Sequence, residues 1–181
     1  MTQNTFDWPD GGLQSEPARE AVSISRITDR IFIGNFIAAT DEKILTSNGI
    51  RAVVCLHEVQ DTVDTARALA ESLEIPFVHF PMIDGGGNDR RLFDRAVSAV
   101  ERFEKEGIVL VSCWAGKSRS VVIAAAAISK AEGISADDAL DKISGQRNTS
   151  VSTGLLPLLY AYDHEHASGG VNLSVERLED I

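Results

Sequence analysis

The sequence is short of cysteine, and this shortage excludes whole classes of protein. Only two cysteines, Cys55 and Cys113, occur among its 181 residues, too few for a disulfide framework or a cysteine zinc site. A chain of this length buries enough surface to fold without such staples. We therefore expect a reducing, cytoplasmic setting.

Positive charge and long apolar runs are also missing. The 17 lysines and arginines stand against 27 acidic residues, so the net charge is −10. General binding to nucleic acid or to an anionic membrane requires a cationic surface, so neither partner is expected. The apolar run Val121 to Ile128 has eight residues, whereas about twenty are needed to cross a bilayer. Residues 1–20 show no basic cluster followed by an apolar stretch, so neither membrane insertion nor a signal peptide is predicted.

The two ends of the chain differ in composition from its middle. Residues 1–23 contain several glycines and prolines without any periodicity, which predicts a flexible N-terminal arm. Residues 169–181 begin with a glycine and stay polar, which predicts a C-terminal tail. Residues 24–168 are then a single domain, as the length of the chain also indicates.

Between the tails, strand and helix patterns alternate. Short apolar runs predict strands over residues 24–27, 31–33, 51–56, 77–82 and 108–111. Helical spacing of apolar residues predicts helices over residues 40–49, 63–73, 92–107, 120–132, from 135 onward, and 155–166. Thr40 and Ser135 are the predicted caps of the first and fifth helix. This alternation indicates an α/β fold, with a central, mostly parallel sheet of about five strands flanked by helices.

The segment from Ile108 to Val122 combines a buried strand, a tight loop and a helix. Loop N–H groups and a helix N-terminus can together hold an oxyanion, and they also favour the thiolate form of Cys113 at the base of the loop. Arg119 can return over the loop and bind two phosphate oxygens at once. Gly116 lets the backbone turn closely, and Ser120 can hydrogen-bond the sulfur. Each residue alone has an ordinary structural explanation, but the pattern Cys-x-x-Gly-x-x-Arg-Ser between strand and helix is far more specific.

This loop resembles the signature of a known family. Ser112-Cys-Trp-Ala-Gly-Lys-Ser-Arg-Ser120 is similar to His-Cys-x-x-Gly-x-x-Arg-Ser/Thr of the cysteine-dependent protein phosphatases, specifically the small, atypical dual-specificity phosphatases. The resemblance covers about residues 25–166. Arg30 to Asn35 resembles the family's opening strand, and Phe80 to Asp84 its acid-bearing segment. Gly145 to Asn148 lies where the family often has an Arg-Pro pair, with Asn148 in place of the proline.

The resemblance implies a strand–loop–helix active site and a two-step phosphoryl transfer. Cys113 is then the nucleophile, Arg119 the phosphate-binding cation, Asp84 the general acid, and Ser120 a hydroxyl that assists the sulfur as it leaves. The implied phosphate-binding loop is formed by Trp114, Ala115, Gly116, Lys117 and Ser118. No metal or other cofactor is implied, and the substrates are phosphorylated proteins, with phosphotyrosine first and phosphoserine or phosphothreonine second.

Several of these residues have a competing explanation. An aspartate before three glycines is commonly a surface turn residue, but the position of Asp84 favours the general acid, with Asp89 as the reserve acid. The glycines predict a mobile loop. Cys55 is either a small core residue or a thiol that captures an oxidised Cys113, because both follow parallel strands at one edge of the sheet. Lys117 is either a solvated cation or a contact for phosphoinositides, and Trp114 either a pocket rim or a packing residue.

One residue departs from the family pattern. Ser112 replaces the signature histidine, which helps to organise the loop and to keep the thiol ionised; this puts the strength of catalysis in question more than the type of reaction. The rival functions are a phosphoinositide or phospholipid phosphatase, an RNA 5′-triphosphatase and a non-catalytic phosphate-binding module. A phosphoinositide phosphatase or an RNA 5′-triphosphatase needs a basic rim around its site, which a net charge of −10 does not favour. A non-catalytic phosphate-binding module has usually lost the equivalent of Cys113, Arg119 or Asp84, and all three are present here.

Overall fold

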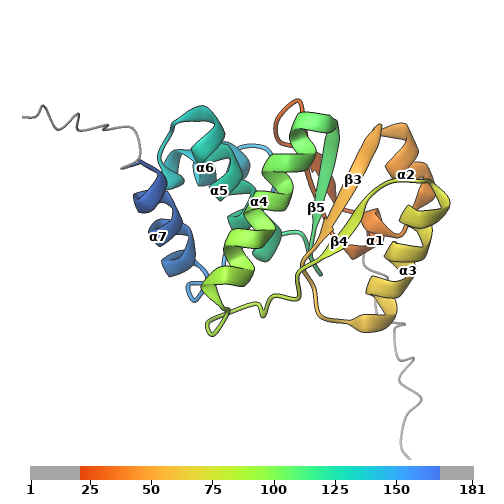
Figure 1. The fold of residues 1–181 in the computed structure, drawn as a ribbon, viewed down its shortest axis with the longest axis horizontal. Coiled ribbons are helices and arrows are strands. Elements are labelled where there is room, and N and C mark those ends of the chain that lie inside the picture. The colour runs from red at the N-terminus through yellow and green to blue at the C-terminus, as the bar shows by residue number, and fades with distance from the viewer. Residues whose placement is uncertain (1–20, 168–181) are drawn as a thin grey trace, which may run out of the picture.

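A five-stranded sheet in the order β1-β2-β5-β3-β4 runs through the middle of the molecule (Figure 1). Its strands are β1 (Ile24–Arg26), β2 (Ile31–Gly34), β3 (Ile50–Cys55), β4 (Phe77–His79) and β5 (Ile108–Ser112). Only β1 is antiparallel to its neighbour, and the pairs β2–β5, β5–β3 and β3–β4 are parallel. This computed structural model describes residues 21–167, and it confirms the predicted α/β fold.

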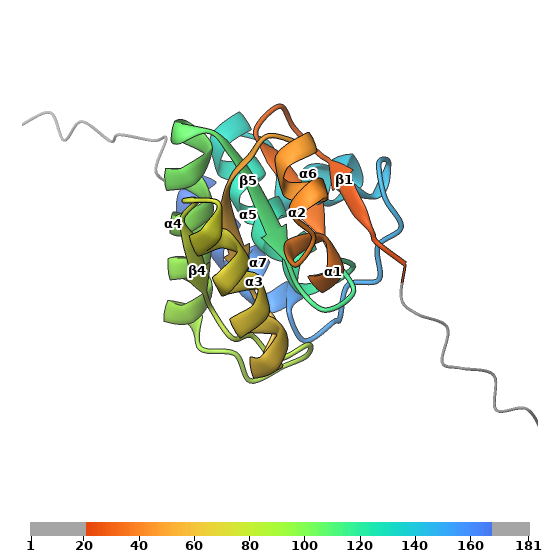
Figure 2. The same ribbon diagram turned by 90° about the vertical axis from the view of Figure 1, so that its right-hand side faces the viewer.

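Helices cover both faces of the sheet. On one face lie α1 (Phe36–Ala39), α2 (Glu42–Ser47) and α3 (Gln60–Ser72), which are in front of the strands in Figure 2. On the other face lie α4 (Arg90–Glu106), α5 (Arg119–Glu132), α6 (Ala136–Ser144) and α7 (Leu156–Ala167). Alternate residues of β3 and β5 supply the two cores: Val53 and Leu110 pack toward α1–α3, and Val54 and Val111 toward α4–α7.

Helix α5 is the centre of the larger core. Every residue from Val121 to Ile128 is at most 1% exposed, because α5 packs against the sheet, α4, α6 and α7. The eight-residue apolar run is therefore the inside of a globular domain. Within residues 21–167, no helix is long and apolar enough to span a membrane.

Several predicted boundaries differ from the structure, and three of them bear on the site or on a helix cap. Thr40 ends α1, and the neighbouring Asp41 caps α2 by accepting a hydrogen bond from Ile44 N at 3.0 Å. The regular part of β4 stops at His79, before residue 82, although Phe80 N and Met82 N still donate to Cys55 O and Leu56 O, each at 2.9 Å. Helix α5 begins at Arg119, one residue earlier than predicted.

The start of the described chain is attached to the sheet. The Asn35 side chain accepts a hydrogen bond from Ser23 N at 3.1 Å and donates one to Ala21 O at 2.9 Å. Residues 21–23, which the sequence placed in the flexible arm, are thus part of the domain. The rest of the predicted arm, residues 1–20, and the predicted tail, residues 169–181, lie outside the described residues.

Candidate active site

The loop that joins β5 to α5 surrounds the Cys113 sulfur. Cys113 is 2% exposed and directly follows β5, whose carboxyl end lies at the same edge of the sheet as those of β3 and β4. Gly116 N donates to Cys113 Sγ at 3.2 Å, and Ser120 Oγ lies 3.2 Å from the same sulfur. The structure therefore brings together the predicted nucleophile, a loop amide and the predicted assisting hydroxyl.

Gly116 is required by this geometry. Its φ of +68° lies in the left-handed region that favours glycine, and a side chain there would come within 2.8 Å of Gly34 O and 2.7 Å of Arg147 Nη2. The loop thus passes closely between strand β2 and the side chain of Arg147. This close approach places the Gly116 amide over the sulfur.

Asp84 contacts the loop through Ser118. Ser118 Oγ donates to Asp84 Oδ1 at 2.6 Å and accepts a hydrogen bond from Ser152 N at 3.0 Å. Asp84 itself is exposed, whereas Ser118 is buried. Asp84, 29 positions before Cys113 in the sequence, is therefore held at the mouth of the loop by Ser118.

The Asp84 loop is well braced, although its three glycines suggest mobility. Asn88 closes it: its side chain accepts from Ile83 N at 2.8 Å and donates to Ile83 O at 2.9 Å and to Gly85 O at 3.0 Å. A side chain at Gly154 would lie 2.3 Å from Gly86 N, so the two backbones are in tight contact. The reserve acid, Asp89, accepts from Arg91 N at 2.7 Å and caps α4.

Arg119 is anchored from the back of the site. It is 4% exposed, and its Nη1 donates to Met82 O at 2.9 Å and to the carboxylate of Glu58. Its buried Nε has no hydrogen-bond partner among residues 21–167. Leaving a buried N–H without a hydrogen bond costs free energy. The Nε of Arg119 is therefore available to donate to a substrate oxyanion.

Sequence reasoning did not identify Glu58 or His57, which follow β3. The pKa of His57 is lowered to about 4, first by burial and then by the charges of Arg119 and His79, so the ring is neutral near pH 7. His57 packs edge-on against Trp114, whose ring stacks on Phe36 at 4.4 Å between centroids. The sequence did offer one indication of both residues: they directly follow a buried strand, at the sheet edge that carries Cys113.

The remaining loop residues lie at the rim. Trp114 is 36% exposed, so it forms part of the rim and also packs on Phe36. Lys117 is exposed, and its backbone oxygen accepts a hydrogen bond from Ser150 N at 2.9 Å. Ala115 is half-buried. Among residues 21–167 there is no cluster of three or more histidine, cysteine or acidic side chains that could hold a metal ion.

Cys55 lies one strand away from the nucleophile. It pairs in register with Ser112, the residue before Cys113, and it is fully buried. Burial raises the pKa of the Cys55 thiol to about 11, and the charge of Cys113 acts in the same direction. The two thiols are thus electrostatic neighbours, as the shared sheet edge predicts.

Comparison with known protein families agrees with this geometry. The family model described as "Dual specificity phosphatase, catalytic domain" matches residues 31–165. The chain belongs to the dual specificity phosphatase family. Among curated relatives, Dual specificity protein phosphatase 18 of Mus musculus is 30% identical over 64% of this chain, and Dual specificity protein phosphatase 21 of Homo sapiens is 31% identical over 65%. The matched region spans 59% of the length of each relative.

Solved structures with a similar fold include dual specificity phosphatases and PTPMT1. Human DUSP28 superposes with a TM-score of 0.69 at 21% identity, covering 78% of this chain and 93% of that one. A mouse putative dual specificity phosphatase complexed with zinc tungstate gives 0.70 at 22% identity, covering 87% and 96%. PTPMT1 in complex with PI(5)P gives 0.68 at 16% identity, covering 82% and 99%.

Proposed function

We propose that this protein is a cysteine-dependent phosphatase that hydrolyses phosphate monoesters in proteins, phosphotyrosine first and phosphoserine or phosphothreonine second. The observation that carries the proposal is the arrangement around Cys113. A loop amide and the Ser120 hydroxyl contact the sulfur, Arg119 retains an unused buried donor, and Asp84 is held at the loop mouth. We also propose a cytoplasmic setting, because a thiol nucleophile needs reducing surroundings.

The first step transfers the phosphoryl group to sulfur. The Cys113 thiolate attacks phosphorus, a sulfur–phosphorus bond forms, and the bond from phosphorus to the leaving oxygen breaks. Asp84 gives its proton to that oxygen as it leaves. Arg119 and the loop amides stabilise the equatorial oxygens, where negative charge resides in the transition state.

The second step releases phosphate. Asp84, now a carboxylate, takes a proton from a water molecule that attacks phosphorus, and the sulfur–phosphorus bond breaks. The Ser120 hydroxyl, 3.2 Å from the sulfur, stabilises the thiolate that departs. Glu58 touches no reacting atom in this scheme; it keeps the Arg119 side chain in place and leaves the rest of the guanidinium for substrate.

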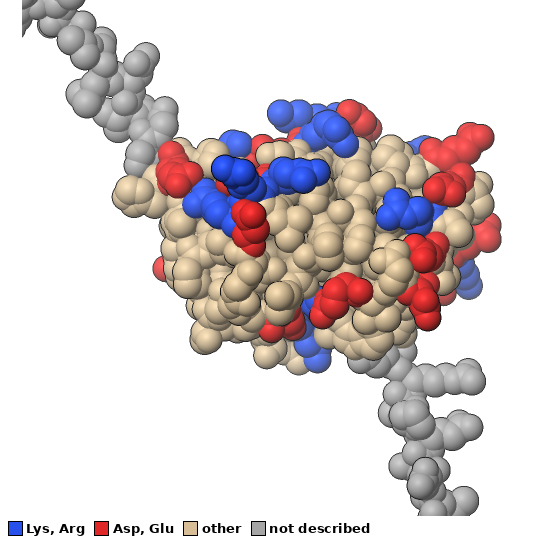
Figure 3. Space-filling view, turned by 60° about the horizontal axis from the view of Figure 1, so that its bottom comes forward, with Lys and Arg blue, Asp and Glu red and all other residues tan. Residues whose placement is uncertain are grey.

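Surface charge favours proteins over phosphoinositides as substrates. The face at the carboxyl ends of the strands has few charged side chains near its centre (Figure 3). Lys117 is exposed there, but so is Glu58, whose side chain is 55% exposed. A headgroup with several phosphates needs more cations than this rim offers. The complex of PTPMT1 with PI(5)P keeps phosphoinositides as the second candidate. RNA 5′-triphosphates are the third candidate, which only the sequence motif supports.

A substrate panel tests this proposal. We expect the chain to release phosphate from phosphotyrosine peptides faster than from phosphoinositides or triphosphorylated RNA. Cys113→Ser should abolish hydrolysis but still bind a phosphate analogue, whereas Arg119→Ala should lose both. Full activity of Cys113→Ser would exclude the covalent thiol mechanism, and faster release from phosphoinositides would reassign the substrate class.

A further inference from the structure

Arg147 is a buried cation without an acidic partner. It follows α6 and is 8% exposed, yet no carboxylate among residues 21–167 forms an ion pair with it. Its Nη1 donates to Ile33 O at 2.5 Å, its Nη2 donates to Ser23 Oγ at 3.1 Å, and its Nε has no partner in the same part of the chain. Because a buried charge is expensive unless it is balanced, Arg147 needs a countercharge.

The guanidinium of Arg147 lies against the catalytic loop. A side chain at Gly116 would come within 2.7 Å of Arg147 Nη2, so the group is in contact with the backbone of Gly116. The amide of that same residue donates to Cys113 Sγ at 3.2 Å. Arg147 therefore packs behind the part of the loop that holds the sulfur, and it also ties the loop to strand β2.

The charge of Arg147 interacts with Cys113. Burial lowers the pKa of Arg147, and the negative charge of Cys113 opposes this shift. Such coupling is reciprocal, because a thiolate that stabilises a cation is stabilised by that cation to the same extent.

The second buried arginine at the loop is in a different situation. Arg119 is paired with the Glu58 carboxylate, so much of its positive charge is already balanced when no substrate is bound. The other titratable groups in or next to the catalytic loop are the Cys55 thiol, the neutral His57, exposed Lys117 and Asp84 at the loop mouth. Of the two buried arginines, only Arg147 lacks an acidic partner in the described chain.

We propose that Arg147 is a positioning residue that supplies the countercharge of the Cys113 thiolate. The Ser112 hydroxyl cannot carry a positive charge, whereas a guanidinium is protonated at every physiological pH. The inference rests on the proposed function only in taking Cys113 as the reactive group. Arg147 acts through the loop and the sulfur and need not touch substrate.

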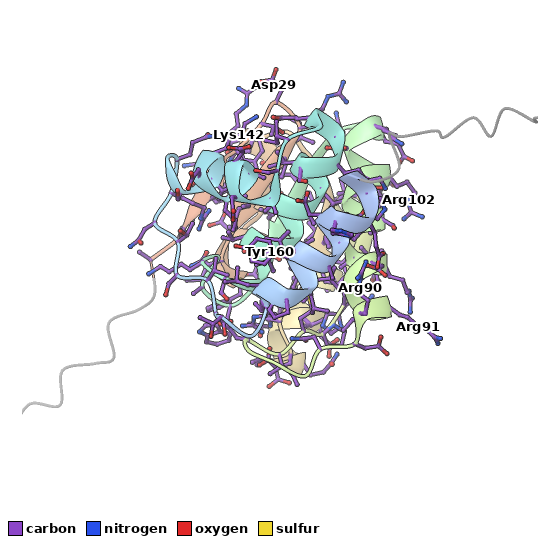
Figure 4. The ribbon with its side chains drawn as sticks, turned by 90° about the vertical axis from the view of Figure 1, so that its left-hand side faces the viewer. Asp29, Arg90, Arg91, Arg102, Lys142 and Tyr160 are labelled. Atoms are coloured by element: carbon purple, nitrogen blue, oxygen red, sulfur yellow. The ribbon has the colours of Figure 1, made fainter. Side chains whose placement is uncertain are left out.

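The pH dependence of Cys113 alkylation tests this role without any substrate. The full chain is treated with iodoacetamide at a series of pH values, and modification of the Cys113 peptide is followed by mass spectrometry. We expect Arg147→Gln to raise the pH midpoint of alkylation by about one unit, which makes the reaction about tenfold slower well below the midpoint. Arg102→Gln is the matched control, because Arg102 is exposed on α4 (Figure 4) and should leave the midpoint unchanged.

A second variant keeps Arg147 and balances its charge. Ser23 is half-buried and accepts a hydrogen bond from Arg147, so Ser23→Asp places a carboxylate beside the guanidinium. We expect this variant to fold and to raise the midpoint by roughly half a unit, since a carboxylate now shares the charge. Ser23→Asn has nearly the same shape without the charge and should behave like the native chain.

The outcomes separate this inference from the proposed function. A raised midpoint in Arg147→Gln and Ser23→Asp, but not in Ser23→Asn, supports the countercharge even if phosphatase activity is never found. An unchanged midpoint in folded Arg147→Gln overturns it even if the chain is an active phosphatase. If Arg147→Gln does not fold, Ser23→Asp alone decides, and a midpoint equal to that of Ser23→Asn overturns the inference.

Discussion

At the scale of single residues, two nearby aspartates have different surroundings. Asp84 accepts a hydrogen bond from the catalytic loop, whereas Asp89 accepts one from its own helix. The structure therefore places Asp84 at the catalytic loop and Asp89 at the start of α4, while the role of Asp84 as general acid stays a prediction. Sequence alone left both open, because each lies in a polar, glycine-rich stretch that carries no regular pattern.

We expect Asp84→Asn to slow turnover by roughly 10²–10⁴, the usual effect of removing a positioned acid. The loss should be greatest for alkyl phosphates, whose leaving oxygen needs a proton, and small for nitrophenyl phosphate. Steady-state rates across a series of leaving groups measure this. An equal loss for every leaving group would mean that Asp84 only supports the loop.

Cys55 offers a second prediction at this scale. Its raised pKa, about 11, keeps the thiol protonated at neutral pH, which favours the core residue over the resolving thiol. We therefore expect peroxide to inactivate native protein and Cys55→Ser alike, and thiol reductant to restore both to a similar extent. Recovery of activity after a peroxide pulse is the measurement. Recovery in the native chain but not in Cys55→Ser would show that Cys55 captures the oxidised nucleophile.

At the scale of elements, the caps determine where helices begin. Asp41, Asp89 and Ser135 each accept a hydrogen bond from an N–H in the first turn of the helix that follows. These interactions are local and can be read from sequence once the boundary is known. The start of α5 is different, because the Ser118 side chain bonds Asp84 and makes no helix cap.

Asp89→Ala should lower the free energy of unfolding by about 1 kcal/mol through loss of the α4 cap. Asp89→Asn, which can still cap, should lose much less, and neither variant should change turnover with nitrophenyl phosphate by more than about twofold. Urea denaturation and steady-state kinetics check the two halves of this prediction. A large loss of activity in Asp89→Asn would restore Asp89 as a candidate acid.

At the scale of the whole molecule, buried His57 links stability to pH. Its pKa is about 4 in the folded protein, mainly because the ring is buried, and near 6.5 when the chain is unfolded. Between these values the unfolded chain binds a proton that the folded chain does not. This contribution to stability is therefore complete above pH 6.5 and is lost as pH falls toward 4.

We expect the free energy of unfolding to fall with decreasing pH below 6.5, with His57 contributing a slope of up to about 1.4 kcal/mol per pH unit. His57→Leu cannot titrate, so the native chain should lose more stability than this variant between pH 6.5 and 4.5. Urea denaturation of both proteins across that range gives the difference. Parallel pH curves would show that His57 is not the group responsible.

Local patterns in the sequence determined the fold class and the central loop. Alternating strand and helix patterns predicted the mostly parallel sheet, and the spacing from Cys113 to Ser120 predicted a loop around the sulfur that the geometry now shows. The sheet and the loop could be predicted because hydrophobic periodicity, and the contacts within one short loop, involve residues that are close together in the chain. The catalytic roles of these residues stay predictions.

Only the tertiary structure decided which distant residues meet this loop. Glu58 reaches Arg119 across 61 positions of sequence, and Arg147 reaches Ile33 across 114. No periodicity marks such contacts, because they depend on how strands are ordered in the sheet and on which side chains remain unpaired after the core has formed. Which charged side chains pack against the loop is therefore a property of the packed molecule, whereas the place of Cys113 in a strand–loop–helix unit follows from the local sequence.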